Sequence, residues 1–260
     1  MRAWLQSVRR FNERRVLRRR AIPDALWQLT LARYPFLAQR SAADLDELRR
    51  LSSLFLHGKE FSGAHGLQVD DEMAVAIAAQ ACLLVLRLGL QAYGGFVGIV
   101  VHADEVQVRR EIVDDNGVVH EFDDVLSGEA MAGGPVMLSW RDVSEVGASA
   151  EWGYNVVVHE FAHILDMGDG LADGIPPLPS ALARQHWQAV LTQEYEAFCA
   201  RVDRGEDTVL DPYGTDSHEE FFAVASEAFF VAPLEMRTEQ PTLYALLAGY
   251  FLQDPAAPDS

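Results

Sequence analysis

The sequence predicts an α+β fold, with a helical N-terminal part, a small mixed β-sheet and a helical core that carries the motif His-Glu-x-x-His. Three observations lead to this prediction. Residues up to about 93 place apolar side chains at helical spacing, residues 96–140 contain β-branched runs separated by turn signals, and helical patterns return from residue 155. Helices, then a small sheet, then helices are typical of an α+β domain.

Three helices are expected before the sheet. The first covers residues 22–33, the second Ser41–Leu56, and the third runs from about Asp70 to Tyr93. Ser41 precedes an Ala-Ala-Asp turn and is the expected N-cap of the second helix, because a serine hydroxyl accepts a hydrogen bond from a first-turn backbone N–H.

Strand-like runs begin after Gly94. They cover Phe96–Val101, Glu105–Val113, Val118–Phe122 and Val136–Trp140. Asn116-Gly117 lies between the second and third runs, and this dipeptide between two strands is a strong signal of a β-hairpin.

Helical patterns return after the sheet and complete the expected domain. They cover Asn155–Asp166, Ala181–Arg204, Ser217–Val231 and Glu235–Gly249. We expect residues 1–20 to be a basic arm, residues 21–252 to be one α+β domain, and residues 253–260 to be a flexible tail. Within the domain, residues 21–93 form the helical part and residues 94–252 form the core that holds the motif.

Charge is distributed unevenly along the chain. The net charge is −18, yet residues 1–50 hold 12 of the 21 basic residues and only 5 of the 39 acidic ones. An acidic body disfavours direct DNA binding, because phosphate contacts need clustered Lys and Arg. The arginines between residues 9 and 20 can contact RNA or anionic lipid, or they form a solvated helix face or pack on the chain's own acidic surface.

Other features of the sequence exclude several classes of protein. The two cysteines, Cys82 and Cys199, are far apart and have no C-x-x-C spacing, which argues against a disulfide scaffold and a cysteine-bound metal. The N-terminus lacks the apolar run and cleavage site of a secretory signal. The longest apolar stretch, residues 73–101, is broken by polar residues and glycines, so we expect a cytoplasmic protein without a transmembrane segment.

The motif His159-Glu160-Phe161-Ala162-His163 predicts a zinc site. Positions four apart lie on one face of a helix, so His159 and His163 can bind the same ion. Glu160 then lies beside the metal, where it can take a proton from a zinc-activated water as general base. The alternative, two histidines four apart by chance, is disfavoured because burying an unpaired His-Glu-His stripe in an apolar helix costs free energy.

A catalytic zinc site needs a third protein ligand, and two candidates are open. Asp169 lies where metzincins place their third ligand, but Asp166 occupies the position where that pattern has a glycine. Glu220 on a later helix is the favoured ligand, in a segment that is similar to the E-x-F-A stretch of gluzincins. Alternatively, the Glu220 side chain forms a capping box with Ser217. If Glu219 forms the cap with Asp216 instead, the Glu220 side chain is available to bind the metal.

Two further residues are expected close to the metal. Glu227 lies two helical turns after Glu220 and is expected to hydrogen-bond a ligating histidine. Tyr213 precedes Gly214, which suggests a mobile loop, and its phenol can donate to the oxyanion of a tetrahedral intermediate; its alternative role is packing. The strand Val136–Trp140 is expected to border the cleft and to pair with an extended substrate, because strand addition needs no particular sequence.

Three blocks of sequence resemble the Mlc titration factor A peptidases. They are Gly134–Trp140, Asn155–Asp166, and Tyr213 together with Glu220–Glu227. The resemblance covers about residues 94–233 and implies a gluzincin metallopeptidase, a zinc aminopeptidase with a zincin-type core similar to the anthrax lethal factor catalytic domain. It implies one Zn²⁺ per chain, and it also implies that a transcriptional repressor of sugar uptake, an Mlc-like protein, is a partner.

Three functions are therefore weighed. The first is a zinc-dependent peptidase, most simply an aminopeptidase, acting on a peptide or protein substrate. The second is a regulatory protein that sequesters a transcription factor, with catalysis secondary; the intact Glu160 favours the first, because structural zinc needs no base beside it. The third is a protein held on RNA or membrane by its arginine arm, which requires salt-sensitive binding that deletion of residues 1–20 removes.

Overall fold

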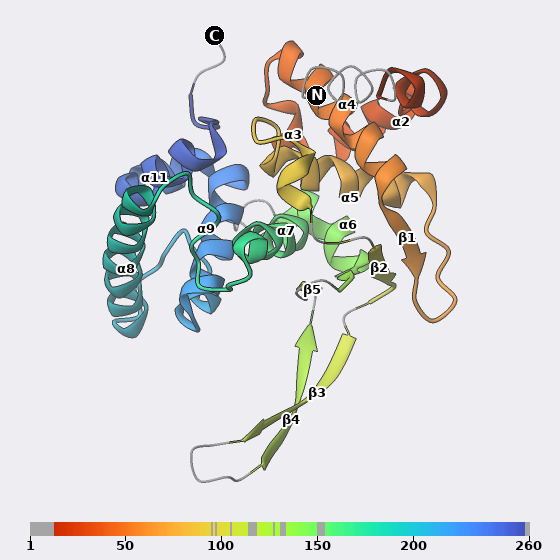
Figure 1. The fold of residues 1–260 in the computed structure, drawn as a ribbon. Helices are drawn as coiled ribbons and strands as arrows, with labels where there is room; N and C mark the ends of the chain where they lie inside the picture. The colour runs from red at the N-terminus through yellow and green to blue at the C-terminus, as the bar shows by residue number, and fades with distance from the viewer. Residues whose placement is uncertain are drawn as a thin grey trace.

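The computed structural model describes residues 13–94, 96, 98–104, 106–113, 119–126, 128–130, 134–149 and 154–257. The predicted α+β class is confirmed (Figure 1). Beyond a helical stretch at residues 13–20, the helices are α2 (Asp24–Arg33), α3 (Pro35–Ala38), α4 (Ala42–Gly58), α5 (Asp71–Leu84), α6 (Trp140–Ser149), α7 (Val156–Asp166), α8 (Ala181–Asp203), α9 (His218–Val231), α10 (Pro233–Glu239) and α11 (Pro241–Phe251). The strands are β1 (Glu60–Gly63), β2 (Gly98–His102), β3 (Val106–Val113), β4 (Val119–Leu126), β5 (Gly128–Ala130) and β6 (Val136–Ser139).

The N-terminal helices agree with the sequence except at the end of α5. Ser41 is the N-cap of α4, and its side chain accepts a hydrogen bond from the backbone of Asp44. α5 ends at Leu84, nine residues before the predicted end at Tyr93. Gly89, with φ of 83°, redirects the chain into the short 3-10 helix η1 (Leu90–Tyr93), which the continuous apolar pattern concealed.

Strand β6 lies inside the main sheet, whose order is β1-β2-β6-β5. β1, β2 and β6 are parallel, while β5 pairs with β6 in antiparallel register. The prediction that Val136–Trp140 pairs with substrate is therefore wrong, because β2 and β5 already use both edges of β6. β5 is the last strand on that side, and it lies against α7.

The predicted hairpin is present as a separate two-stranded sheet. β3 and β4 pair antiparallel from Val106 opposite Leu126 to Val113 opposite Val119. The Asn116-Gly117 turn lies outside the described residues. Figure 1 shows that β3 and β4 project away from the rest of the molecule.

Three other segments differ from the sequence prediction. Trp140 begins α6, a helix that the sequence did not indicate. The predicted helix Glu235–Gly249 is split into α10 and α11 at Pro241, whose ring nitrogen cannot donate a helical hydrogen bond. In the expected tail, Gln253 donates to the carbonyl of Leu83 and Ala256 donates to the hydroxyl of Tyr244, while residues 258–260 lie outside the described residues.

Helix α7 lies at the centre of the molecule, between α5 on one side and α9 on the other (Figure 1). One apolar core contains side chains from all three helices and from the sheet. Because α7 is covered on several sides, nearly all of its residues are buried. Within the described residues, none of the helices is both long enough and apolar enough to cross a membrane.

Candidate metal centre

The two histidines of the motif project from one face of α7, as the spacing predicts. The helix begins after Asn155, whose side-chain oxygen accepts a hydrogen bond from the backbone of Val158. His159 and His163 follow one turn apart, and their Nε2 atoms are 3.1 Å apart. The apolar residues between them, such as Phe161, are fully buried and fix the rotation of the helix.

Helix α9 places Glu220 beside the two histidines. Ser217 is the N-cap of this helix and accepts a hydrogen bond from the backbone N–H of Glu220. The Glu220 carboxylate instead faces the histidines, with Oε2 at 3.0 Å from His159 Nε2 and 3.4 Å from His163 Nε2. The suggestion that Glu219 and Asp216 would form the cap is wrong, because Ser217 caps the backbone without using the Glu220 side chain.

His159, His163 and Glu220 form a site of suitable size for a metal ion. Their ligand atoms all lie within 4.8 Å of one another, and within the described part of the chain they are the one such group of three or more. A tetrahedral ion bound at about 2.0–2.2 Å holds its ligand atoms roughly 3.3–3.6 Å apart. The observed separations of 3.0–3.4 Å approach that spacing, so the three donors fit a metal with little movement.

Glu227 contacts His159 at Nδ1, the ring nitrogen that does not face Glu220 and His163. Its Oε1 lies 2.7 Å from His159 Nδ1, and its Oε2 accepts a hydrogen bond from the backbone N–H of Asn155. A proton held on Nδ1 by the carboxylate leaves the Nε2 lone pair directed at the metal position. The predicted contact between Glu227 and a histidine of the motif is therefore confirmed.

The carboxylates and histidines shift each other's protonation. Burial disfavours a charged His159, but hydrogen bonds to Glu220 and Glu227 outweigh it and raise the pKa of His159 well above its usual value. Burial also acts to raise the pKa of Glu220, yet hydrogen bonds to His159 and His163 hold it far below its usual range. Protons and a metal ion therefore compete for the same histidine nitrogens.

Glu160 is buried close enough to this group to feel the charges of His159, His163 and Glu220. It is 5% exposed, and burial raises its pKa to about 7. Its Oε2 atom is buried and has no hydrogen-bond partner among the described residues. A buried oxygen without a partner calls for an explanation, and a water molecule bound to a metal at the three donors would supply the missing hydrogen bond.

Tyr213 also reaches the site. It lies in the 3-10 helix η4 (Pro212–Thr215), its ring centroid is 6.0 Å from that of His159, and it is about half exposed. The structure does not present a loose loop here. Asp211 caps the turn by accepting from the Tyr213 backbone, and Gly214 is buried so tightly that a Cβ would come within 3.3 Å of Phe198.

Asp169, the other candidate for the third ligand, is engaged elsewhere. It lies in the 3-10 helix η3 (Met167–Asp169), and its Oδ2 pairs with Arg184 at 2.9 Å. Its Oδ1 accepts a hydrogen bond from the backbone of Leu171. It is not part of the group that can hold a metal.

Sequence reasoning missed two buried polar residues near the site. Gln80 on α5 accepts a hydrogen bond from the Asn155 side chain, and Asp166 at the end of α7 accepts one from the backbone of Gly174. Both are fully buried. The available signal was a polar residue inside an otherwise apolar helix, Gln80 in the run Met73–Leu84.

Comparison with known proteins identifies the family. The profile of the glucose-regulated metallopeptidases M90 matches residues 8–252. An uncharacterised protein of Synechocystis is 38% identical over 231 residues, covering 88% of this chain and 84% of its own length. Mlc titration factor A from Cronobacter sakazakii is 34% identical over 90% of this chain and 88% of its own length, and the protein of the same name from Pectobacterium atrosepticum is 34% identical over 89% and 87%. The chain therefore belongs to the glucose-regulated metallopeptidase family M90, together with Mlc titration factor A.

Proposed function

We propose that this protein is a zinc-dependent peptidase, and most simply an aminopeptidase, in which His159, His163 and Glu220 hold one zinc ion. The observation that carries the proposal is the convergence of these three donors within 4.8 Å, although Glu220 follows the two histidines by 57 and 61 residues. When bound, zinc would act as a Lewis acid that polarises a peptide carbonyl and lowers the pKa of a water molecule towards about 7.

Glu160 is the general base in this proposal. Its carboxylate accepts a proton from the attacking water and then passes it to the nitrogen of the leaving amine. Burial supports this role, because it raises the pKa of Glu160 to about 7, close to the value at which a base both accepts and releases a proton at neutral pH. Its unpartnered Oε2 is free for a water or substrate contact.

Tyr213 is proposed to donate a hydrogen bond to the oxygen that becomes negatively charged when water attacks the carbonyl. Its ring lies beside His159, on the edge of the site, and its exposed position lets the hydroxyl meet a substrate. Glu227 has a positioning role, because it touches His159 rather than the reacting atoms.

An extended substrate is proposed to pair with β5 rather than with β6. β5 ends the sheet on the side of α7, so its outer edge has main-chain groups for strand addition next to the metal helix. A structure with a bound peptide-like inhibitor tests this placement, and an inhibitor backbone away from β5 would contradict it.

The test of catalysis is the variant Glu160→Gln, assayed with aminoacyl fluorogenic substrates and with internally quenched peptides. We expect normal zinc content and thermal stability, but a loss of most turnover, because glutamine cannot accept the proton. The control Glu219→Gln removes the carboxylate that precedes Glu220 in the sequence and should retain activity. Full activity of Glu160→Gln would contradict the mechanism, and turnover of blocked peptides alone would make the enzyme an endopeptidase.

A regulatory role is the second candidate. The observation that favours it is the similarity over most of the chain to proteins named Mlc titration factor A, in a family described as glucose-regulated. A transcriptional repressor of sugar uptake is then a partner or substrate in the cytoplasm. A repressor assay with Glu160→Gln separates the two: a persisting regulatory effect without turnover would make binding the primary function.

A further inference from the structure

Gln80 is a fully buried polar residue in a helix that is otherwise apolar. It lies on α5 with alanine, valine, isoleucine and leucine as its neighbours, and none of its surface is exposed. Burying an amide costs free energy unless it is hydrogen-bonded. Its Nε2 donates to the carbonyl of Ala76 in its own helix, and its Oε1 accepts a hydrogen bond of 2.8 Å from Asn155 Nδ2.

Two other buried polar residues in the same core donate a hydrogen bond within their own helix. Ser52 donates to the carbonyl of Leu48, and Ser226 donates to the carbonyl of Phe222, each within its own helix. Gln80 differs because its acceptor is used between helices. The bond reaches Asn155, the residue that caps the helix of the metal motif.

From Asn155 the hydrogen bonds continue to the metal centre. The Asn155 side-chain oxygen accepts from Val158 at 2.9 Å, while its backbone N–H donates to Glu227. Glu227 in turn holds His159 Nδ1 at 2.7 Å. Gln80, Asn155 and Glu227 are all buried, so water is not available to replace a missing partner.

We propose that Gln80 is a positioning residue for the metal centre, acting through Asn155 and Glu227 on the orientation of His159. The inference rests on the proposed function, because it concerns zinc held by His159. It assigns part of the metal site to the N-terminal helical region, which contributes no ligand itself.

The physical reason is competition for one carboxylate. If Gln80 loses its acceptor, the Asn155 amide becomes a buried donor without a partner, which costs about 1–3 kcal/mol. The Glu227 carboxylate already accepts a hydrogen bond from the Asn155 backbone, so it is the nearby acceptor for the unpaired Asn155 side-chain amide. A Glu227 drawn towards this amide holds His159 Nδ1 less well, and the Nε2 atom on the other side of the ring is less accurately directed at the metal.

The experiment measures the zinc dissociation constant by competition with a chelator, together with the melting temperature of the metal-free protein. Gln80→Met removes the acceptor at nearly constant volume. Asn155→Ser breaks the same bond from the other side while keeping an oxygen that can cap Val158. Ser226→Ala is the control, because it removes a buried hydrogen bond on the helix of Glu227 that does not lead to His159.

We expect Gln80→Met and Asn155→Ser each to raise the zinc dissociation constant roughly 3- to 10-fold, below the 10- to 100-fold typical of a residue that touches the ligand itself. The double variant should bind zinc no more weakly than the weaker-binding single variant, because both substitutions break the same hydrogen bond. Gln80→Glu keeps the acceptor and should bind zinc nearly as wild type. Ser226→Ala should lower the melting temperature only.

The outcomes separate this inference from the proposed function. A lower melting temperature with an unchanged dissociation constant in Gln80→Met would make Gln80 a structural residue and overturn the inference. If Gln80→Met does not fold, an unchanged constant in Asn155→Ser overturns it equally. A wild-type protein that binds no zinc would instead overturn the proposed function.

Discussion

Four of the carboxyl groups on helices α7 and α9 have surroundings that set their protonation and their contacts differently. Glu220 faces two histidines and stays ionised, while burial raises the pKa of Glu160 to about 7. Glu227 is held by His159 and the Asn155 backbone. Asp166 has one oxygen bound to Gly174 and the other buried without a hydrogen-bond partner among the described residues. Position relative to the histidines, rather than residue type, distinguishes the proposed metal ligand, the proposed base and the other two groups.

Tyr213→Phe tests the proposed oxyanion contact. If the hydroxyl acts mainly in the transition state, kcat should fall roughly ten- to a thousand-fold, on the scale of one lost oxyanion donor. KM and zinc content should change little, because the ring still packs beside His159. The measurement is steady-state kinetics on an aminoacyl substrate; an unchanged kcat would make Tyr213 a packing residue.

Asp166→Asn tests a pH effect on stability. Burial raises the pKa of Asp166 from 3.8 to about 6, so between about pH 4 and 6 the folded state keeps a proton that the unfolded chain has lost. Raising the pH across this window therefore lowers the free energy of unfolding, by about 3 kcal/mol for a shift of this size. Asparagine retains an acceptor for Gly174 and should remove this part of the slope. Denaturant titrations with chelator present measure it, and parallel curves for the two proteins would contradict the prediction.

The sequence predicted the residues whose placement depends on local spacing. His159 and His163 were paired by helical periodicity, and Glu220 and Glu227 by their separation of two turns. Gln80 was not found, because its role depends on contact between α5 and the start of α7, 75 residues later. Single-sequence periodicity holds no information about such a contact.

At the scale of elements, the segment between α7 and α8 contacts both helices that carry the proposed metal ligands. Gly174 donates its N–H to Asp166, and its carbonyl accepts from the Trp187 indole at 2.9 Å. Arg184 binds both Asp169 and Asp173. Gly174 also lies against the backbone of His218, at the start of α9. The segment therefore fixes the first turn of α9, which carries Glu220, relative to α7.

Gly174→Ala tests this arrangement against a matched control in the same segment. Gly174 and Gly170 both have positive φ, 74° and 94°, so alanine costs about 1–2 kcal/mol at either position. At Gly174 a Cβ would also lie 2.4 Å from the carbonyl oxygen of His218, whereas at Gly170 nothing lies within 4 Å. We expect both variants to lose stability, but only Gly174→Ala to lose zinc affinity. Equal zinc affinity in the two variants would contradict a positioning role for the segment.

Errors at this scale have physical causes. The strand character of Val136–Trp140 was correct as far as Ser139, but its pairing depends on the order of strands, which alternation along one strand does not specify. The split at Pro241 and the end of α5 near Gly89 were marked by a proline and a glycine, whose signals were weaker than the apolar pattern around them.

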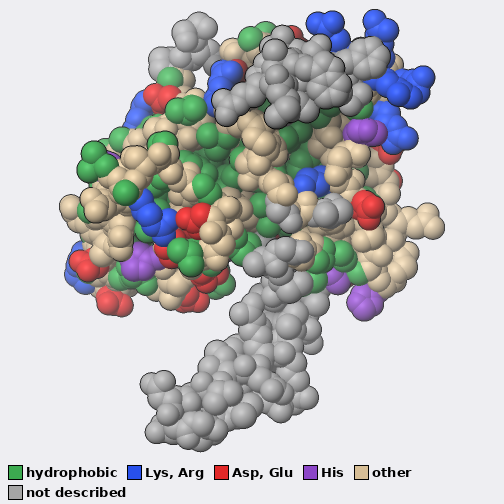
Figure 2. All heavy atoms as spheres, viewed as in Figure 1, with side chains coloured by type: hydrophobic (Ala, Val, Ile, Leu, Met, Phe, Trp, Pro, Cys, Tyr) green, Lys and Arg blue, Asp and Glu red, His purple; other side chains and the backbone are tan. Residues whose placement is uncertain are grey.

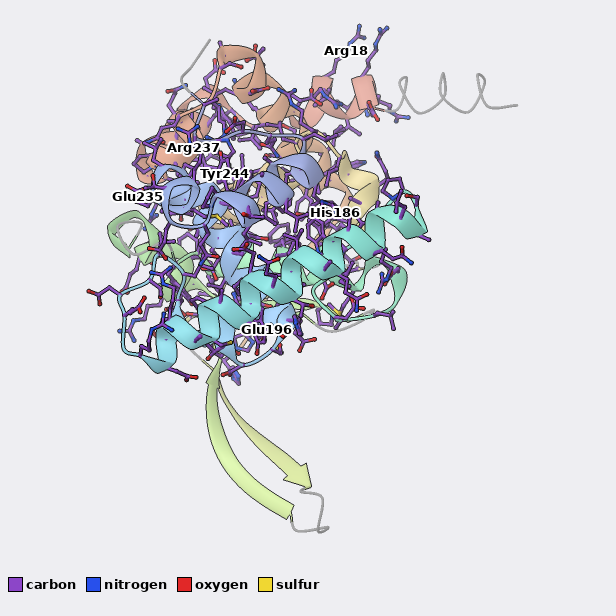
Figure 3. All side chains as sticks on the ribbon, turned by 90° about the vertical axis from the view of Figure 1, so that its left-hand side faces the viewer. Arg18, His186, Glu196, Glu235, Arg237 and Tyr244 are labelled. Carbon is purple, nitrogen blue, oxygen red and sulfur yellow. The ribbon has the colours of Figure 1, made fainter. Side chains whose placement is uncertain are left out.

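At the scale of the whole molecule, one apolar core contains side chains from the N-terminal helices and from the helices of the candidate metal centre. The arginines of the N-terminal helix lie outside this core. The core contains residues from Ile22 to Ala256. Basic side chains gather near the N-terminal helix in Figure 2, and Arg18 points away from the body in Figure 3. The exposed arginines of this helix are Arg14, Arg15, Arg18, Arg19 and Arg20. None of these five makes an ion pair with another described residue, and Arg9 and Arg10 of the predicted arm lie outside the described residues.

The most direct test is the zinc content of purified variants, measured by mass spectrometry after dialysis against zinc and a weak chelator. Wild type should hold one zinc per chain, and His159→Ala, His163→Ala and Glu220→Ala should each lose it. Glu219→Ala changes the neighbouring carboxylate in the same turn of α9, and Asp169→Ala removes the rival ligand; both should keep the metal. Full zinc content in Glu220→Ala, with loss in Asp169→Ala, would contradict the central assignment.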